Sequence, residues 1–263
     1  MTTDASAVAG TAVALRPEPH HDLLDVAVEG DLDDLDALDA VVDAVAALSA
    51  GARDRQVRLV ADHPADVAHP LPGAVAARLG LTEHRELLQL RRPLPVPEQH
   101  PARRGAALPL RRFDPGRDAL AWIRQNNRAF AWHPDQGHQD EASLRATLDE
   151  PWVELAGFLV LDDPDRPGEL AGSCWTRRHE AADGDPALGE IFVIGVDPSC
   201  QGRGLGTALV LAGLDHLAAA GLRVGMLYVE ATNAAALGTY ERLGFVPHLR
   251  RRIAAAPHGG APR

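Results

Sequence analysis

The 263-residue sequence contains no lysine, so all 26 of its cationic side chains are arginines. Its two cysteines, Cys174 and Cys200, are too few for a disulfide scaffold and do not have the spacing of metal ligands. The histidines are also scattered without that spacing, so no metal is expected. A formal net charge of -11 disfavours nucleic-acid binding, which needs a cationic face against the phosphates.

Long apolar runs are missing as well. No stretch reaches the roughly 18 apolar residues that a membrane span needs. The first ten residues lack the basic and apolar segments of a signal peptide. We therefore expect a soluble, cytoplasmic protein that binds neither membranes nor nucleic acid, with a monomer as the default expectation.

Prolines divide the sequence into two parts. Three prolines at alternate positions, Pro93, Pro95 and Pro97, forbid a helix there and favour extended chain. The length is sufficient for two small domains that each bury a core. The predicted organisation is a first module at 1–92, a linker at 93–107, a second domain at 108–253 and a disordered tail at 254–263.

The first part has the pattern of a small α/β module. Apolar residues at spacings of three and four predict a helix over 31–49. A short strand is expected at 57–60, a second helix at 72–79 that ends before Gly80, and a final strand at 87–90.

The second part alternates helical and extended patterns. Helices are predicted at 115–133, 138–148, 202–220 and 233–243, and strands at 153–161, 170–177, 189–196, 225–230 and 245–253. This order predicts an α/β (α+β) fold, with helices packed on a mixed, mostly antiparallel sheet.

The most specific signal is a glycine-rich segment between an apolar strand and an apolar helix. Gly202, Gly204 and Gly206 allow backbone N–H groups to converge on phosphate oxygens, and the following helix adds its positive end. A dinucleotide-binding loop needs GxGxxG, and a Walker loop needs Gly-Lys-Ser/Thr, neither of which occurs here. The segment therefore predicts an anion-binding loop, with a plain flexible turn as the alternative.

This segment resembles the pyrophosphate loop of the GNAT family of N-acetyltransferases. The match runs from Gln201 to Gly206, after a Gly-Val-Asp-Pro sequence. The segments 233–237 and 240–245 resemble the last helix of that family and its Leu-Gly-Phe ending. The resemblance covers about 190–245, with compatible elements back to 108. It implies the GNAT fold and acetyl-CoA as co-substrate.

Three further stretches, 126–137, 172–177 and 227–233, resemble the mycothiol-forming branch of the family. Its members acetylate the cysteinyl amine of Cys-GlcN-Ins, the last step of mycothiol biosynthesis. They are tandems of two GNAT repeats in which the second is catalytic. The segments 59–64 and 77–81 resemble the end of a first repeat, yet 31–52 contains no glycine but Gly51. We therefore expect a degenerate N-terminal repeat that binds no acetyl-CoA.

The resemblance also implies a role for each site residue. Glu190 would be the general base, which draws a proton from the substrate ammonium through water. Tyr240 would be the general acid that protonates the departing thiolate of CoA. Asp135, Arg177, Glu190 and Tyr228 would contact the acceptor. The predicted acetyl-CoA contacts are Ile194, Gly195, Val196, Gln201, Gly202, Arg203, Gly204, Leu205, Gly206, Thr207, Asn233, Ala234, Ala235, Ala236, Leu237 and Gly238.

Two acceptor residues depart from the pattern of that branch. Its members usually have Glu in place of Asp135 and Lys in place of Arg177. Both changes keep the charge, but the first changes reach and the second changes hydrogen-bond geometry. An acetyltransferase for another small-molecule or peptide amine is therefore an alternative. A second alternative is a non-catalytic acetyl-CoA-binding protein, in which Glu190 is a surface carboxylate and Tyr240 a core aromatic.

Overall fold

The computed structural model describes residues 5–8, 11–17, 23–30, 36, 38–50, 56–65, 69–133, 137–182 and 184–256. The chain forms two compact units. The first consists of Met1–Leu90, Val229–Ala234 and Pro247–Arg263, and the second of Arg91–Tyr228 and Ala235–Val246. Strands β5, β10 and β11 each contribute residues to both units. The first unit therefore includes two segments from near the C-terminus as well as the N-terminal part of the chain.

The second unit is built on a mixed sheet with the strand order β10-β9-β8-β7-β6. Its strands are β6 Arg111–Arg112, β7 Phe158–Asp162, β8 Leu170–His179, β9 Leu188–Val196 and β10 Val224–Glu230. The strands from β6 to β9 pair antiparallel, and β10 lies parallel to β9. The predicted mixed, mostly antiparallel sheet is confirmed.

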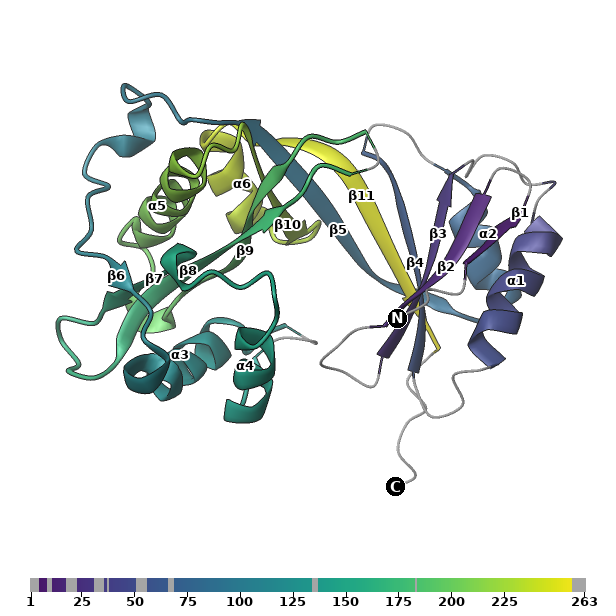
Figure 1. Cartoon of the computed structure of the whole chain (residues 1–263), viewed down its shortest axis with the longest axis horizontal. Helices are drawn as coiled ribbons and strands as arrows, with labels where there is room; N and C mark the ends of the chain where they lie inside the picture. Colours follow the sequence, from purple (N-terminus) through teal and green to yellow (C-terminus); the bar gives the residue numbers. More distant parts are fainter. Residues whose placement is uncertain are drawn as a thin grey trace. The chain divides into compact units, whose positions relative to one another are not determined.

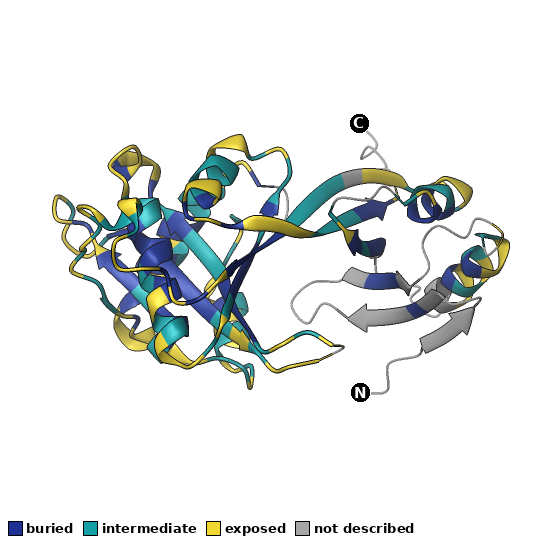
Figure 2. Ribbon diagram, turned by 90° about the horizontal axis from the view of Figure 1, so that it is seen from above, coloured by how far each residue is buried: buried dark blue, intermediate teal, exposed yellow. Residues whose placement is uncertain are grey.

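Helices cover both faces of this sheet (Figure 1). Helices α3 Pro115–Ala129 and α4 Glu141–Leu148 lie on one face, and α5 Leu205–Ala219 lies on the other. Helix α6 Ala234–Arg242 follows β10. In this unit the central strands are largely buried and the outward helix surfaces are exposed (Figure 2).

A small residue of α5 packs on one face of the sheet, and aromatic residues pack on the other. A Cβ built on Gly213 of α5 would lie 2.7 Å from both the Cys174 sulfur and Ile191, so α5 packs closely on β8 and β9. On the other face, Trp175 stacks on Phe158 at 4.3 Å and meets Trp122 of α3 edge-on at 6.0 Å. Neighbouring residues Cys174 and Trp175 thus point to opposite faces, as strand geometry requires.

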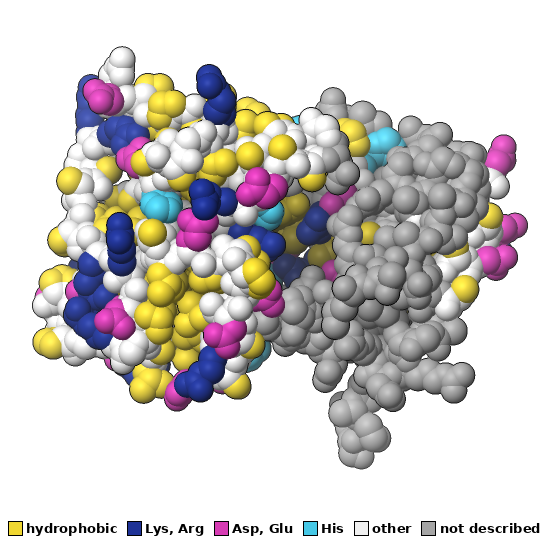
Figure 3. All heavy atoms as spheres, viewed as in Figure 1, with side chains coloured by type: hydrophobic (Ala, Val, Ile, Leu, Met, Phe, Trp, Pro, Cys, Tyr) yellow, Lys and Arg dark blue, Asp and Glu magenta, His cyan; other side chains and the backbone are white. Residues whose placement is uncertain are grey.

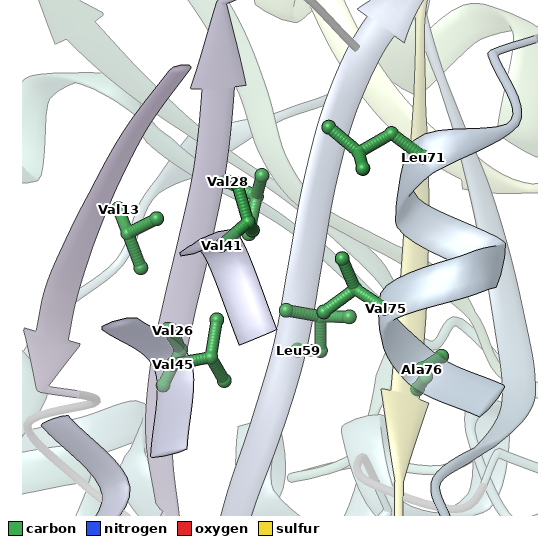
Figure 4. Packing of buried hydrophobic residues seen from close by; sticks show 10 residues of the cluster. Val13, Val26, Val28, Val41, Val45, Leu59, Leu71, Val75 and Ala76 are labelled. Atoms are coloured by element: carbon green, nitrogen blue, oxygen red, sulfur yellow. The ribbon is translucent and has the colours of Figure 1, made fainter. Parts of the chain in front are cut away.

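The first unit has the strand order β1-β2-β3-β4-β11-β5. Its strands are β1 Ala5–Val8, β2 Thr11–Pro17, β3 Leu23–Gly30, β4 Gln56–Pro64, β5 Thr82–Pro93 and β11 Val246–Ala255. Helices α1 Leu38–Ala50 and α2 Leu71–Arg78 bury Val41, Val45 and Val75 against strand residues such as Val26 and Leu59 (Figure 4).

The element order repeats between the units. In the first unit, β3, α1 and β4 form a parallel strand–helix–strand unit, and β9, α5 and β10 form another in the second. The first parallel pair is joined at six positions, from Leu23↔Gln56 to Val28↔Ala61. The second is joined at two. The repeats therefore share an order of elements but differ in the number of residues over which the two parallel strands are paired.

Several element boundaries differ from the prediction. Strands β1, β2 and β3 were not predicted, and β5 runs over 82–93 rather than 87–90, because it has strand neighbours on both sides. The predicted strand at 153–161 begins instead with a 3-10 turn, Leu155–Gly157, where the Gly157 carbonyl accepts a hydrogen bond from Thr176. Strand β11 continues to Ala255, two residues into the predicted tail.

Candidate active site

The two parallel strands of the second unit separate at Glu190. Strand β10 pairs with β9 at Gly225↔Gly189 and Met226↔Glu190, and the ladder ends there although both strands continue. All residues of both strands belong to the described part of the chain. Backbone groups of β9 beyond Glu190 are therefore free of β10 and available to a ligand that enters between the strands.

A β-bulge in β9 lies beside this separation. Strand β8 pairs Thr176 with Ile191 and Trp175 with Val193, so Phe192 is the extra residue. Ile191 faces α5, whereas Phe192 packs edge-on against Trp152 at 4.8 Å and Trp175 at 5.6 Å. Bulges of this kind redirect side chains next to functional sites.

Glu190 is 7% exposed and faces away from α5, because its neighbour Ile191 points toward that helix. Its Oε2 lies 2.7 Å from Nε2 of His179. Arg177 is its register partner on β8, but the guanidinium lies 4.4 Å over the Trp152 ring and 6.0 Å from the Phe192 ring. The sheet therefore presents a buried carboxylate that is hydrogen-bonded to a histidine and has a stacked arginine as its register partner.

The glycine loop connects β9 to α5 and is open. Gly202 has φ +78° and Gly204 has φ +76°, conformations that L side chains rarely adopt. A Cβ at either position would meet nothing within 4 Å, and residues 201–204 are exposed. Gly204 is the N-cap of α5 and supplies no side-chain hydrogen bond to the first turn. The first N–H groups of α5 can therefore bind an anion.

A buried carboxylate anchors this loop. Asp197, 1% exposed, accepts hydrogen bonds from Arg128 Nε at 2.7 Å and from Ser199 N at 3.0 Å, and Arg166 lies 3.0 Å away. Burial alone would raise the pKa of Asp197. The hydrogen bonds from Ser199, Arg128 and Arg166 outweigh it and lower that pKa to about 2.

The ionised Asp197 should stabilise the second unit above about pH 4. Because its folded pKa lies below the unfolded value of about 3.9, this contribution is present above the unfolded pKa and is lost as pH falls toward 2. The full contribution is on the order of 2 kcal/mol, and about half should be lost by pH 3. Urea unfolding at pH 7, 5, 4 and 3 should show a shallower loss of stability in Asp197→Asn than in the wild type. Identical slopes would contradict the assignment, and exposed Asp165→Asn is the control.

Tyr240 lies on α6 and is 8% exposed, with its ring 5.8 Å from that of Phe245. Burial, with a smaller contribution from neighbouring Cys174, raises the pKa of Tyr240 to about 12. The phenol therefore keeps its proton at physiological pH.

The remaining predicted residues fall on elements around the separation. Ile194, Gly195 and Val196 form the end of β9, and Tyr228 lies on β10. Asn233 directly precedes α6, whose first turns contain residues 234–238. A Cβ on Gly195 would lie 2.9 Å from Nε2 of buried Gln125, so glycine permits the approach of α3. Asp135 lies outside the described residues, so its predicted acceptor contact stays a prediction.

The described residues show neither a continuous basic surface on the face in view nor a cluster of metal ligands. Basic and acidic side chains alternate with apolar ones on the face of the second unit in Figure 3, which shows no continuous basic surface among the described residues. Within the described part of the chain, no three His, Cys, Asp or Glu side chains gather to hold a metal ion, and no helix is long and apolar enough to span a membrane.

Sequence analysis missed two groups of residues at this site. His179 could have been found, because it follows Trp175 and Arg177 at a spacing of two and so faces the same side of β8. The network around Asp197 had no local signal, since Arg128 and Arg166 come from distant segments.

Comparisons with known proteins agree with this geometry. Residues 119–245 match the family model described as the Acetyltransferase (GNAT) family. A mycothiol acetyltransferase of Geodermatophilus obscurus is 43% identical over 221 residues, covering 78% of this chain and 71% of the relative. One of Acidimicrobium ferrooxidans is 50% identical over 168 residues, covering 64% of this chain and 53% of the relative. The chain thus spans little more than half the length of the latter.

Solved structures share the fold at low identity. A GCN5-related N-acetyltransferase from Sphaerobacter thermophilus has a TM-score of 0.66 at 18% identity, covering 93% of this chain and 76% of that one. A tandem GNAT protein from the clavulanic acid biosynthesis pathway has a TM-score of 0.62 at 19% identity, covering 96% and 80%. These structures show the fold. The family model and the sequence relatives show that the chain belongs to the GNAT family of acetyltransferases, in the group of these mycothiol acetyltransferase relatives.

Proposed function

We propose that the protein transfers the acetyl group of acetyl-CoA to the cysteinyl amine of Cys-GlcN-Ins, the last step of mycothiol biosynthesis. The observation that carries this proposal is the end of the β9–β10 ladder at a buried glutamate. The gap leaves β9 backbone groups for a donor thioester, and Glu190 stands where an acceptor amine would meet it. The names of the sequence relatives supply the acceptor.

The residues present fit acetyl-CoA, which the GNAT family uses. The open glycines at 202 and 204 and the uncapped start of α5 suit the pyrophosphate. The end of β9 suits the pantetheine arm, because its N–H and C=O groups lack a β10 partner. When bound, acetyl-CoA supplies an activated thioester.

Glu190 acts as the general base and Tyr240 as the general acid in this mechanism. Glu190, through one water, accepts a proton from the acceptor ammonium, which frees the nitrogen lone pair to form the new C–N bond. As the C–S bond breaks, the Tyr240 hydroxyl donates its proton to the thiolate. The nitrogen loses its second proton as the amide forms, and a proton returns through solvent to the Tyr240 phenolate. Glu190 faces away from α5 and serves the amine, whereas Tyr240 comes from α6 and serves the sulfur.

The acceptor side has a cation of fixed orientation. Arg177 is stacked on Trp152, and its buried Nε has no hydrogen-bond partner within the described residues. A hydroxyl or carbonyl of a polar acceptor would satisfy that donor. With Tyr228 and Asp135, it would form the contacts to the sugar and cysteinyl parts.

The first repeat serves as a structural partner in this proposal. Its parallel strands stay paired over six positions, so they leave no gap like that between β9 and β10. Calorimetric titration should give one acetyl-CoA per chain, and Gly204→Asp should abolish that heat. A second site, or binding that survives the substitution, would contradict the assignment.

The acceptor is tested by comparing amines. The kcat/KM of CoA release should be about 100-fold or more higher for Cys-GlcN-Ins than for free cysteine, glucosamine or a peptide with N-terminal cysteine. Preference for another amine would favour a different acetyltransferase. Tight acetyl-CoA binding without turnover of any amine would favour the non-catalytic alternative.

A further inference from the structure

The carboxylate of Glu190 has one side-chain partner in the described part of the chain. His179 Nε2 lies 2.7 Å from Oε2, and the side chains are 30% and 9% exposed. A carboxylate has only acceptor atoms, so the His179 Nε2–H donates this hydrogen bond. Oε2 is therefore held, and Oε1 is left for the acceptor.

Arg177 does not form an ion pair with the Glu190 carboxylate. Arg177 is opposite Glu190 in register, yet its guanidinium stacks on Trp152 at 4.4 Å. A bidentate arginine would bind both oxygens of the carboxylate and leave neither for a substrate proton. A single donor from His179 fixes the carboxylate while one oxygen stays available.

We infer that His179 is a positioning residue for the acetyl transfer, which holds the Glu190 carboxylate so that Oε1 faces the acceptor amine. This inference rests on the proposed function of Glu190 as general base. The requirement is geometric, because a base must lie within hydrogen-bond reach of the proton that it removes or of the one water that relays it. Loss of the donor would let the carboxylate rotate away from the amine or onto Arg177.

The test is the steady-state rate of CoA release for the full chain with acetyl-CoA and Cys-GlcN-Ins. His179→Ala should lower kcat by about 10- to 100-fold, with the KM for acetyl-CoA unchanged. His179→Gln should recover most of the rate, because its amide nitrogen can donate to the same oxygen. Arg178→Gln is the matched control, since this exposed neighbour pairs with Glu154, and it should leave kcat unchanged.

A double-mutant cycle separates this role from simple structural support. In a Glu190→Gln background, His179→Ala should lower kcat little further, because a residue that acts through the Glu190 carboxylate has no carboxylate left to position. Melting temperatures of all variants check that each one folds.

Each outcome bears on a different claim. An unchanged kcat in His179→Ala, no recovery in His179→Gln, or an equal loss in both backgrounds would overturn the inference while the proposed function stands. A Glu190→Gln variant as fast as the wild type would overturn the base and this inference together. No wild-type turnover with any amine would overturn the proposed function itself.

Discussion

Replacing Glu190 with glutamine should lower kcat by about 100-fold or more, the range in which general-base catalysis contributes. Glutamine has nearly the same shape as glutamate, and its carbonyl oxygen can still accept the hydrogen bond from His179. It cannot take up a proton at working pH. The acceptor would then remain an ammonium more often, without the lone pair that attacks the thioester.

The effect should appear in kcat and leave the KM for acetyl-CoA unchanged, because Glu190 faces the α3 side rather than the glycine loop. CoA release under saturating substrates measures it. The control is Glu154→Gln, an exposed glutamate in an ion pair with Arg178, and it should retain the wild-type rate. A Glu190→Gln enzyme with unchanged kcat would show that another group, or solvent, accepts the proton.

Replacing Gly204 with aspartate should raise the KM for acetyl-CoA by about 100-fold or more. Aspartate tolerates positive φ better than most residues and is a favourable N-cap, so α5 should still form. Its carboxylate would occupy the open space over the first turn of α5, where the pyrophosphate is proposed to bind. The helix would then be capped by its own side chain, and a second anion would be repelled.

The same helix offers a matched control. Gly221, just after the end of α5, has φ +88°, and a Cβ added there would likewise meet nothing within 4 Å. Gly221→Asp therefore introduces the same side chain, with similar backbone strain, at the opposite end of the helix. It should leave the KM for acetyl-CoA unchanged. Equal effects of the two substitutions would mean that the loss comes from strain or stability rather than from phosphate binding.

The parts of the site that could be predicted are those encoded by residues close together in the sequence. The glycine loop was predictable, because glycine spacing, a preceding strand and a following helix lie within about twenty residues. The separation of β9 from β10 was not, since it depends on pairing between strands that α5 keeps apart in sequence. The bulge at Phe192 also depends on a partner strand and leaves no mark in the order of residues.

Errors in the first unit have a similar origin. Strands β1 and β2 are rich in alanine, which does not favour strands, and they form through their antiparallel pairing.

In the second unit, Leu94 and Val96 fall in the predicted linker but are buried, and the Leu94 N–H donates to the Arg223 carbonyl. Proline spacing correctly excluded a helix there but could not reveal this packing.

The proposed transfer can be tested by following the acetyl group itself. The protein would be incubated with Cys-GlcN-Ins and acetyl-CoA carrying a deuterated acetyl group, and the product would be fragmented in a mass spectrometer. We expect the label on the cysteinyl nitrogen, with one CoA released per acetyl group transferred. Label on the sulfur alone, or no labelled product while acetyl-CoA binds, would contradict it.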